Sequence, residues 1–394
     1  MVGKPNVGKS TLFNALTLLD VAMAPYPFTT TVPNRGVGAV RAKCPHTEKG
    51  VACTPGNAKC VAGTRWIPVN LVDVPGLVPG AHQGKGLGHR FLDDLRAADG
   101  FVQVVDLSGA TDAEGRLVPP GSHDPAEEVR WLEEELVEWV AEILSRDFDR
   151  QARSTELDGK KVEEFLGQRL TGLSIPTAAI SAALRTVPVD RGHPARWSVD
   201  DRRNLARELL RAAKPRLVAA NKCDRVARDA ATALGERVAP IPAVPTSAEA
   251  ELTLRRAARA GLVEYAPGDP SFSVPDPARL SPPQQKALDG VRAILTAWGS
   301  TGVQGALESM VFDRLRQIVV YPVEDETHWT DGQGRVLPDA LLVPAGTTAS
   351  AVAFRVHTDL GRNFIRAIDG RTHRALAADH PVEANSVLRI VARK

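Results

Sequence analysis

The sequence is poor in cysteine, in long apolar runs and in any excess of charge. Four of its 394 residues are cysteine, too few for the disulfide framework of a secreted protein of this length. No apolar run reaches the roughly 18 residues that a membrane-spanning helix needs, and the N-terminus lacks an apolar signal segment. The net charge of +2 does not indicate a protein that coats nucleic acid, but it does not exclude a local basic patch. We expect a cytoplasmic, monomeric protein without membrane contact, with two or three domains.

The first ten residues contain a phosphate-binding pattern. They include GKPNVGKS, which fits G-x-x-x-x-G-K-[ST], and apolar residues at helical spacing follow. In such a loop the glycines let N–H groups converge on phosphate oxygens, Lys9 reaches the β- and γ-phosphates, and the Ser10 hydroxyl binds Mg²⁺. The alternative is a glycine turn before an ordinary amphipathic helix. We expect nucleotide-binding residues at Gly3, Asn6, Val7, Gly8, Lys9, Ser10 and Thr11.

A D-x-x-G motif follows at the end of an apolar stretch. Its Asp73 would stand at the carboxyl end of a strand, where the carboxylate can hold the water shell of Mg²⁺. Gly76 can offer its N–H group to the γ-phosphate, because a glycine permits close approach. The next apolar run, Phe101–Asp106, predicts a further buried strand.

The stretch LVAANKCD predicts a strand that ends in an N-K-x-D motif. The Asp224 carboxylate can accept two hydrogen bonds from guanine N1–H and N2–H₂, while Asn221 contacts N7 and Lys222 packs over the base. Ser247 and Ala248 follow, and their backbone can contact the guanine carbonyl. Each motif is weak alone, but their order predicts GTP or GDP, with Mg²⁺, as the ligand.

Two longer segments resemble a known family. YPFTTTVPNRGVG (Tyr26–Gly38) and DVPGLVPGAHQGKGLGHRFLDDLRAADGFVQVVD (Asp73–Asp106) are similar to the Obg/YchF family of translation-factor-related GTPases, and to its archaeal and eukaryotic YchF-like branch above all. With the tail described below, the resemblance covers nearly the whole chain. It implies an α/β P-loop GTPase domain, with a mostly parallel sheet flanked by helices.

The resemblance also implies a catalytic set of Lys9, Thr30 and Gly76. Matching F-T-T puts the switch threonine that completes the Mg²⁺ shell at Thr30, with Thr29 as the second choice. The position after D-x-x-G, often a glutamine that orients water, is Leu77. The family shares this hydrophobic substitution, and slow intrinsic hydrolysis follows from it.

Two further site residues are weaker expectations. Asn6 matches the asparagine that binds a potassium ion in related GTPases, although asparagine is also a common turn residue. His82 could serve as a general base, but a solvated side chain is the simpler interpretation.

Only Met1 and Val2 stand where relatives place an apolar strand of about five residues before the first glycine. One explanation is a start assigned too late, and the other is a natural chain that tolerates the loss. A truncated central strand would expose ladder groups and apolar surface, so we expect lower stability than in the family.

Three cysteines and a histidine fall within 17 residues, at Cys44, His46, Cys53 and Cys60. Their number and chemistry suit tetrahedral Zn²⁺, but the spacing matches no compact zinc module. The sequence is compatible with three interpretations: unpaired surface thiols in a reducing cytosol, a zinc site, or a redox-sensing disulfide.

The motifs divide the chain into four parts. The GTPase domain occupies 1–123 and 205–317, and a helical hairpin is inserted at 124–204. Asp124 is the expected N-cap of its first helix, and Glu127 would complete a capping box. A charged joint, SRDFDRQARSTELDGKK, separates this helix from a second periodic stretch through Leu170.

The tail, 318–394, predicts strand, strand, helix, strand and strand, with Gly361 ending the helix. It looks like a TGS domain, a β-grasp module whose occurrence implies contact with RNA or the ribosome. An ordinary solvated surface is the alternative. Basic side chains suited to phosphates lie at Arg355, His357, Arg362, Arg366, Arg371, His373 and Arg374.

Three functions compete at this point. The first is a GTPase that switches with its nucleotide in ribosome-associated translation, with the TGS domain and the helical insertion as docking surfaces. The second is a ribosome- or RNA-binding module with a degraded site that no longer hydrolyses nucleotide. The third, an ATPase like YchF, is disfavoured because YchF has lost the N-K-x-D aspartate, whereas Asp224 is present here.

Overall fold

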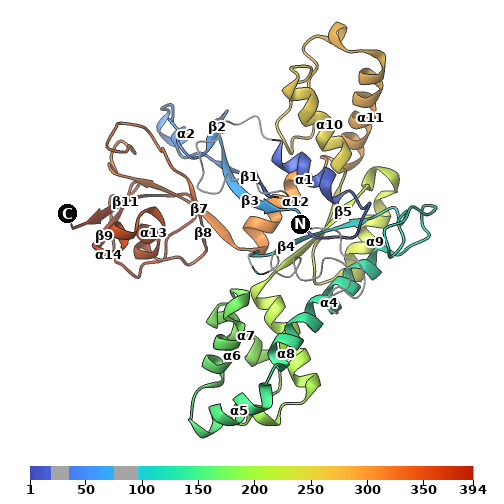
Figure 1. Cartoon of the computed structure of the whole chain (residues 1–394). Helices are drawn as coiled ribbons and strands as arrows, with labels where there is room; N and C mark the ends of the chain where they lie inside the picture. The colour runs from blue at the N-terminus through green and yellow to red at the C-terminus, as the bar shows by residue number, and fades with distance from the viewer. Residues whose placement is uncertain (19–34, 75–95, 97, 394) are drawn as a thin grey trace. The chain divides into compact units, whose positions relative to one another are not determined.

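The computed structural model describes residues 1–18, 35–74, 96 and 98–393. These residues group into two compact units (Figure 1). The larger unit comprises Met1–Ala15 and Val72–Ala306, and the smaller unit comprises Leu16–Leu71 and Leu307–Lys394. Within the described part of the chain, no helix combines the length and apolar character needed to cross a bilayer. The four sequence-based domain boundaries stay predictions.

A parallel sheet of β4 (Phe101–Asp106), β5 (Arg216–Asn221) and β6 (Ala243–Thr246) lies at the centre of the larger unit, in that order. β4 and β5 are apolar runs, and their side chains are buried except for the half-buried Arg216. The register aligns the carboxyl ends of the strands, because Asp106 pairs with Asn221 and Asn221 pairs with Thr246. Ligand sites of open α/β sheets form at this edge.

Met1 and Val2 continue this sheet beyond β4. Val2 forms a parallel bridge with Gln103, and its N–H and C=O groups bond to Val102 O and Val104 N at 3.0 and 2.8 Å. On the other side, Val74 N donates to Met1 O at 3.1 Å. Both side chains are buried. The two residues therefore occupy the position of the expected first strand and lead into the loop before α1 (Lys9–Thr17).

The inserted helical region has more helices than the expected hairpin. Asp124 caps the first helix through Ala126 N, as predicted, but without the capping box expected from Glu127. The charged joint is itself helical, because one side of that stretch buries Phe148, Ala152 and Thr155. The helices are α4 (Pro125–Ser145), α5 (Phe148–Leu157), α6 (Val162–Leu170), α7 (Thr177–Thr186) and α8 (Val199–Ala213).

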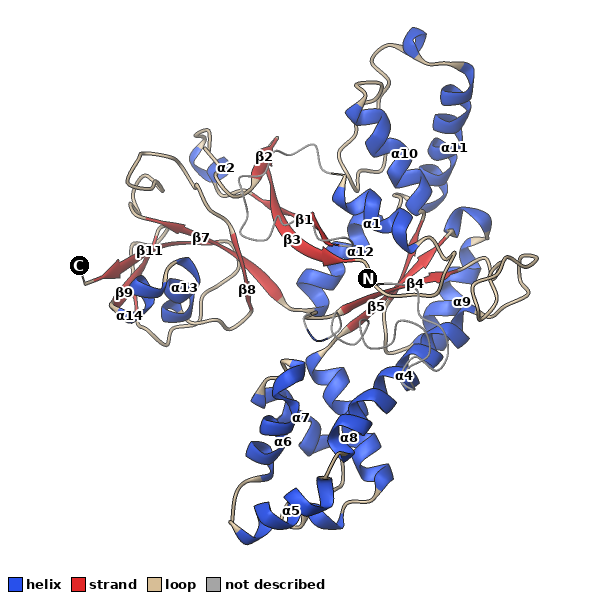
Figure 2. Ribbon diagram, viewed as in Figure 1, coloured by secondary structure: helices blue, strands red, loops and turns tan. Residues whose placement is uncertain are grey.

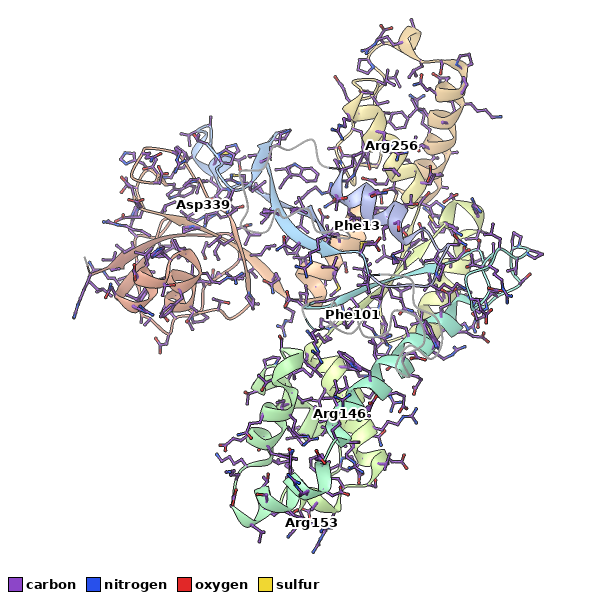
Figure 3. All side chains as sticks on the ribbon, in the orientation of Figure 1. Phe13, Phe101, Arg146, Arg153, Arg256 and Asp339 are labelled. Atoms are coloured by element: carbon purple, nitrogen blue, oxygen red, sulfur yellow. The ribbon has the colours of Figure 1, made fainter. Side chains whose placement is uncertain are left out.

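α4 connects this bundle to the sheet. Its first turns bury Ala126 and Val129 in a core shared with Val105 and Val218 of the sheet. Its later turns bury Leu136 and other apolar residues in the core of the bundle. Figure 3 shows Arg153 of α5 projecting from the end of the bundle.

Among its described residues, the larger unit also contains α9 (Arg228–Val238), α10 (Ala248–Arg259), α11 (Pro282–Trp298) and α12 (Val303–Glu308), which continues into the smaller unit. α10 and α11 share their own apolar core, which includes Leu254 and Leu288. Short 3₁₀ turns occur at Thr171–Leu173, Pro194–Arg196, Cys223–Arg225 and Pro277–Arg279, and a π-helical segment occurs at Ser309–Arg314.

The smaller unit contains two sheets. The first has the order β1 (Arg35–Lys43), β3 (Thr64–Val72), β2 (Lys59–Val61), with the short α2 (His46–Lys49) between β1 and β2. The second has the order β10 (Ala375–Leu376), β9 (Phe364–Asp369), β11 (Ser386–Ala392), β7 (Gln317–Val323), β8 (Leu341–Pro344). α13 (Ala349–Val356) buries Val352 in the core of this sheet, which confirms the expected β-grasp arrangement (Figure 2).

The expected role of Gly361 is wrong. A second helix, α14 (Thr358–Arg362), follows α13 directly, and Gly361 lies inside it. A Cβ atom on Gly361 would come within 2.2 Å of the ring of Phe354 in α13. Glycine is required there for close approach of the two helices, not for a left-handed end.

Candidate functional site

The loop Gly3–Gly8 packs directly against the ends of β4 and β5. Gly3 has φ of +154°, and a Cβ atom there would lie 2.5 Å from Val104 O. Gly8 has φ of +92°, and its Cβ would lie 2.2 Å from Asn221 Nδ2. Both positions therefore need glycine for backbone conformation and for space. The loop leads straight into α1, whose N-terminal N–H groups favour an anion.

Lys9, Ser10 and Asp73 converge beside this loop. Lys9 Nζ forms an ion pair with Asp73 Oδ1, and Ser10 Oγ donates to Asp73 Oδ2 at 3.1 Å. Lys9 and Asp73 are both at least nine-tenths buried. Residues far apart in the sequence thus place a cation, a hydroxyl and a carboxylate together, which are the groups that a phosphate and a hard divalent cation need.

Four expected site residues lie outside the described part of the chain. They are Thr30 and its alternative Thr29, Gly76, and the Leu77 that follows it. His82, the weaker candidate for a general base, also lies there.

Asn221 and Lys222 connect the N-K-x-D motif to the loop. Asn221 Nδ2 donates to Val7 O at 2.8 Å, and its Oδ1 accepts from Ala248 N at 3.0 Å. Lys222 Nζ donates to Asn6 O at 2.9 Å and to Asp106 Oδ2 at 2.8 Å. Burial raises the pKa of Asp106, but hydrogen bonds from Lys222 and Ser108 outweigh that effect and lower it overall.

Asp224 and Ser247 lie at the edge of an open hollow of about 650 Å³, which side chains of α10 and α11 also line. Asp224 is exposed, and its Oδ1 accepts a hydrogen bond from Ser247 Oγ at 2.7 Å. The carboxylate keeps lone pairs for further donors, as a ligand with two adjacent N–H groups would supply.

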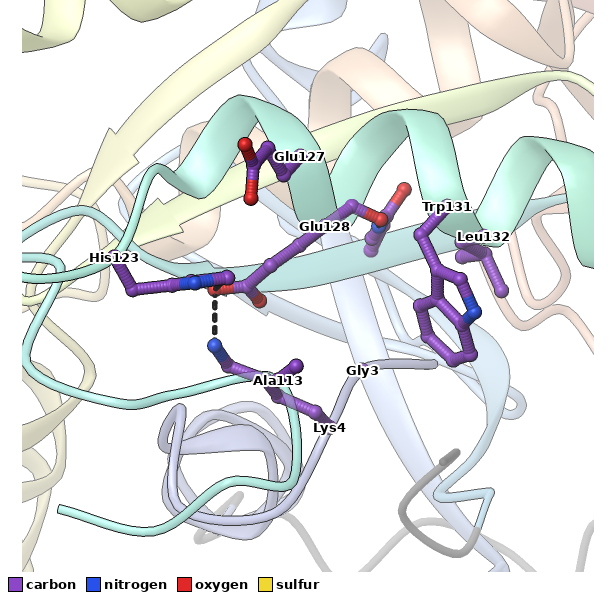
Figure 4. A pocket seen from close by; sticks show the side chains of 9 residues that line it. Gly3, Lys4, Ala113, His123, Glu127, Glu128, Trp131 and Leu132 are labelled. Atoms are coloured by element: carbon purple, nitrogen blue, oxygen red, sulfur yellow. Dashed lines mark hydrogen bonds and ion pairs between the residues drawn. The ribbon is translucent and has the colours of Figure 1, made fainter. Parts of the chain in front are cut away.

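Sequence reasoning missed a buried contact between Lys4 of the loop and Glu128 of α4. Lys4 Nζ lies 2.6 Å from Glu128 Oε1 and donates to Thr111 O at 2.7 Å. Figure 4 shows the pair in a cavity of about 170 Å³, together with His123, whose Nε2 is 3.8 Å from Glu128 Oε1. Burial raises the pKa of Glu128 to about 8, although Lys4 opposes the shift. The available signal was Glu128 itself, a charge four residues before Leu132 on the apolar stripe of α4.

The four possible zinc ligands come together in the smaller unit. The ligand atoms of Cys44, His46, Cys53 and Cys60 all lie within 4.8 Å of one another. The three cysteines are free thiols. Burial raises the pKa of Cys53, and that of Cys60 to about 12.

Comparison with known sequence families gives three matches. Residues 1–145 match the family described as 50S ribosome-binding GTPase. Residues 219–325 match the G4 motif-containing domain of YGR210-like Obg-like GTPases, and residues 333–392 match the TGS domain.

Two individual proteins match over nearly the whole chain, and a third matches over about half of it. The uncharacterized GTP-binding protein MJ1332 of Methanocaldococcus jannaschii is 44% identical over 392 residues, which cover 99% of this chain and 98% of that protein. The crystal structure of a GTP binding protein from Pyrococcus horikoshii OT3 superposes with a TM-score of 0.80 at 36% identity, covering 100% of this chain and 98% of that one. The ribosome-binding ATPase YchF of Haemophilus ducreyi is 33% identical over 196 residues, 48% of this chain and 49% of that protein.

Proposed function

This chain belongs to the Obg-like GTPases, in the branch of MJ1332 and the YGR210-like proteins, and we propose that it is a Mg²⁺-dependent GTP switch with slow hydrolysis. The observation that carries the proposal is the link between two recognition elements. Asn221 bonds both to the phosphate loop at Val7 and to Ala248, next to the hollow where Asp224 and Ser247 lie. Phosphate and base recognition thus meet at one sheet edge.

The phosphate end of the site has a role for each side chain. Lys9 would exchange its ion pair with Asp73 for the β- and γ-phosphates, which frees the Asp73 carboxylate to hold the water shell of Mg²⁺. Ser10, already hydrogen-bonded to Asp73, would bind the same ion directly. N–H groups of Gly3, Val7, Gly8 and Thr11 would cradle the phosphates, and Thr30 and Gly76 would respond to the γ-phosphate.

A potassium ion is a second proposed cofactor. Asn6 Nδ2 donates to Gly115 O at 2.9 Å, so its amide oxygen is the atom offered to a cation. Such a cation would add positive charge beside the phosphates. It would partly offset the hydrophobic Leu77, which cannot orient the attacking water.

The proposed partner is the ribosome or another RNA, bound in the cytoplasm by a monomer. The smaller unit exposes Arg355, Arg362 and Arg366, and it also exposes Phe354 to 52% and Ile365 to 48%. Arginine with an exposed aromatic ring suits phosphates and unpaired bases. The helical bundle is the second proposed docking surface.

Not every basic residue expected on this surface is available. Arg371 forms an ion pair with Glu48 at 2.7 Å, and this contact raises the pKa of Arg371.

Co-sedimentation with ribosomes in the presence of GTP and of GDP tests the proposed switch. The competing function, a docking module that no longer hydrolyses nucleotide, requires binding that is indifferent to the nucleotide.

Base selection is the sharpest test of the site. Asp224→Asn should weaken GTP and improve xanthosine triphosphate, whose carbonyl needs a donor where guanine has an amino group. Charge-assisted hydrogen bonds of about 1.5–3 kcal/mol each make a preference of about a hundredfold for GTP over ATP reasonable in the wild type. Competition binding of GTP, ATP and XTP measures both effects.

Two further variants make this test specific. Asp229→Asn, an exposed carboxylate in the neighbouring α9, should leave all three affinities unchanged. Lys9→Ala should abolish tight binding of all three triphosphates, because the proposed contacts of Lys9 are with the phosphates that they share. A wild type that prefers ATP, as the name of the YchF relative would suggest, contradicts the guanine assignment.

A further inference from the structure

Four soft ligands in the smaller unit have the geometry of a metal site. Cys44 follows β1, His46 opens α2, Cys53 lies in the next loop, and Cys60 lies in β2. The Cys44 and Cys53 sulfurs are 4.0 Å apart, and Cys60 Sγ is 3.6 Å from His46 Nδ1. Tetrahedral Zn²⁺, with bonds of about 2.3 Å to sulfur and 2.0–2.1 Å to nitrogen, requires separations of about 3.8 and 3.6 Å.

The same geometry argues against a disulfide. A disulfide needs sulfurs about 2.05 Å apart, about half the distance between Cys44 and Cys53. It would also use only two of the four converging side chains. A tetrahedral ion uses all of them, and all four ligand atoms already lie within 4.8 Å of one another.

A buried cation beside the cluster points independently to a charged occupant. Arg65 is fully buried and lies directly opposite Cys60 in the β2–β3 pair, so the two side chains share a face of the hairpin. One guanidinium nitrogen donates to Leu337 O, but Nε and Nη1 have no hydrogen-bond partner in the described part of the chain. The buried hydroxyl of Tyr321, whose ring is 5.7 Å from the guanidinium, also lacks one.

The charge of a zinc cluster fits this surplus. Zn²⁺ with three thiolates and one neutral imidazole carries a net charge of −1, and its sulfurs accept hydrogen bonds. Arg65 is then compensated, whereas four neutral ligands leave it a buried cation with two unused donors, which is costly. Asp339, in the loop before β8 (Figure 3), is near enough to act on Arg65 electrostatically but forms no ion pair with it among the described residues.

We propose that Cys44, His46, Cys53 and Cys60 bind one structural Zn²⁺ ion, with Arg65 as its buried counter-charge. Four protein ligands fill the tetrahedron and leave no position for a substrate. The proposed ion therefore has a structural role and takes no part in catalysis.

Both stretches that the ion joins contact the C-terminal part of the same unit. Between Cys53 and Cys60, Thr54 N donates to Val336 O at 2.9 Å and Gly56 N to Pro338 O at 2.7 Å. Between His46 and Cys53, Lys49 lies 4.3 Å from the centre of the Trp329 ring. Holding residues 44–60 in shape therefore holds the attachment of the segment 329–340.

Metal analysis of the full chain, purified without chelators, tests the proposal. We expect one zinc per chain in the wild type and in Cys223→Ser, whose cysteine is buried in the larger unit. Cys53→Ser should lose most of the zinc. The proposal is overturned if reduced wild type reconstituted with Zn²⁺ stays metal-free, or if Cys53→Ser retains a full equivalent.

Cobalt gives a spectroscopic readout of the geometry of the site. Co²⁺ added to the metal-free wild type should produce the visible bands of a tetrahedral thiolate site, and Arg65→Met should weaken its binding by roughly 10–100-fold. Metal removal should also speed amide exchange at 336–340. The proposal is contradicted if the Co²⁺ spectra are those of an octahedral site, or if amide exchange at 336–340 does not depend on the metal.

Discussion

Asn221 holds the phosphate loop, because its Nδ2 atom donates a hydrogen bond of 2.8 Å to the carbonyl oxygen of Val7. Its other amide atom accepts from Ala248 N at 3.0 Å. One buried side chain therefore joins the loop after β-sheet residue Val2 to the segment after β6. The segments proposed to bind the phosphates and the base are therefore linked through Asn221.

Asn221→Ala should consequently lower stability in the absence of nucleotide as well as affinity for GTP. The substitution leaves Val7 O and Ala248 N without their partner, and each unsatisfied buried group costs about 1–3 kcal/mol. We expect a loss of about 2–4 kcal/mol in the free energy of unfolding, measured by thermal and urea denaturation. Asn204→Ala, at an exposed position of α8, should change it little. An Asn221→Ala protein as stable as the wild type would show that this bond does not hold the loop.

The buried Glu128 should make stability depend on pH. Its pKa is raised by burial to about 8 in the folded chain, from an ordinary value of 4.5. Between these values the folded state keeps a proton that the unfolded state releases, so stability falls as pH rises. We expect the wild type to lose about 2–4 kcal/mol between about pH 5 and pH 8 through this group.

Glu128→Gln isolates that contribution, because an amide does not titrate in this range. The difference in melting temperature between the variant and the wild type should grow in favour of the variant as the pH rises. Glu127→Gln, an exposed neighbour on the same turn, is the matched control and should follow the wild type. Parallel pH profiles for Glu128→Gln and the wild type would mean that Lys4 keeps the carboxylate charged throughout.

Arg169 should stabilise the helical bundle. Its Nη2 atom donates to Leu144 O at 2.8 Å at the C-terminal end of α4, and its guanidinium lies 5.6 Å from the centre of the Phe148 ring. Arg169→Met removes charged hydrogen bonds and a favourable interaction with the helix dipole, so we expect a loss of about 1.5–3 kcal/mol.

Urea unfolding followed by tryptophan fluorescence measures this loss, because Trp197 stacks on Phe148 at 5.8 Å. Arg153→Met removes an exposed arginine of the same bundle and should shift the midpoint much less. Equal midpoints for the two variants would show that Arg169 contributes no more than a surface residue.

The parts of the fold that depend on local pattern could be predicted from the sequence. Phe101–Asp106 and Arg216–Asn221 are apolar runs that fill buried strands, and their polar last residues lie at the expected edge. Asp124 and Pro125 mark the start of α4 because capping chemistry is local. The strands and the first helix of the tail followed from the same kind of reasoning, whereas the β-grasp arrangement was implied by the resemblance to a TGS domain.

The parts that depend on tertiary contacts could not be predicted. α5 is mostly polar and forms because Phe148 and Ala152 find an apolar core. Gly361 resembles a helix end but instead makes room for Phe354. The approach of Lys4 to Glu128 joins residues that no motif connects. Cysteine spacing alone left the metal question open, because the backbone path that brings Cys44 to Cys60 is not encoded in the spacing.

The division of the chain into two units limits where the C-terminal domain can be cut from the protein. Residues 333–392, which match the TGS domain, resemble an independent domain that could be transferred to another protein. Their structural unit, however, also contains Leu16–Leu71. That stretch leaves the larger unit within the last turn of α1 and returns just before Asp73. A fragment that begins at residue 307 would lose Thr54 and Gly56, whose N–H groups donate to Val336 O and Pro338 O, together with the rest of Leu16–Leu71. Transplanting the C-terminal domain with its whole unit would therefore also require residues 16–71, which lie between the expected phosphate loop and the D-x-x-G motif.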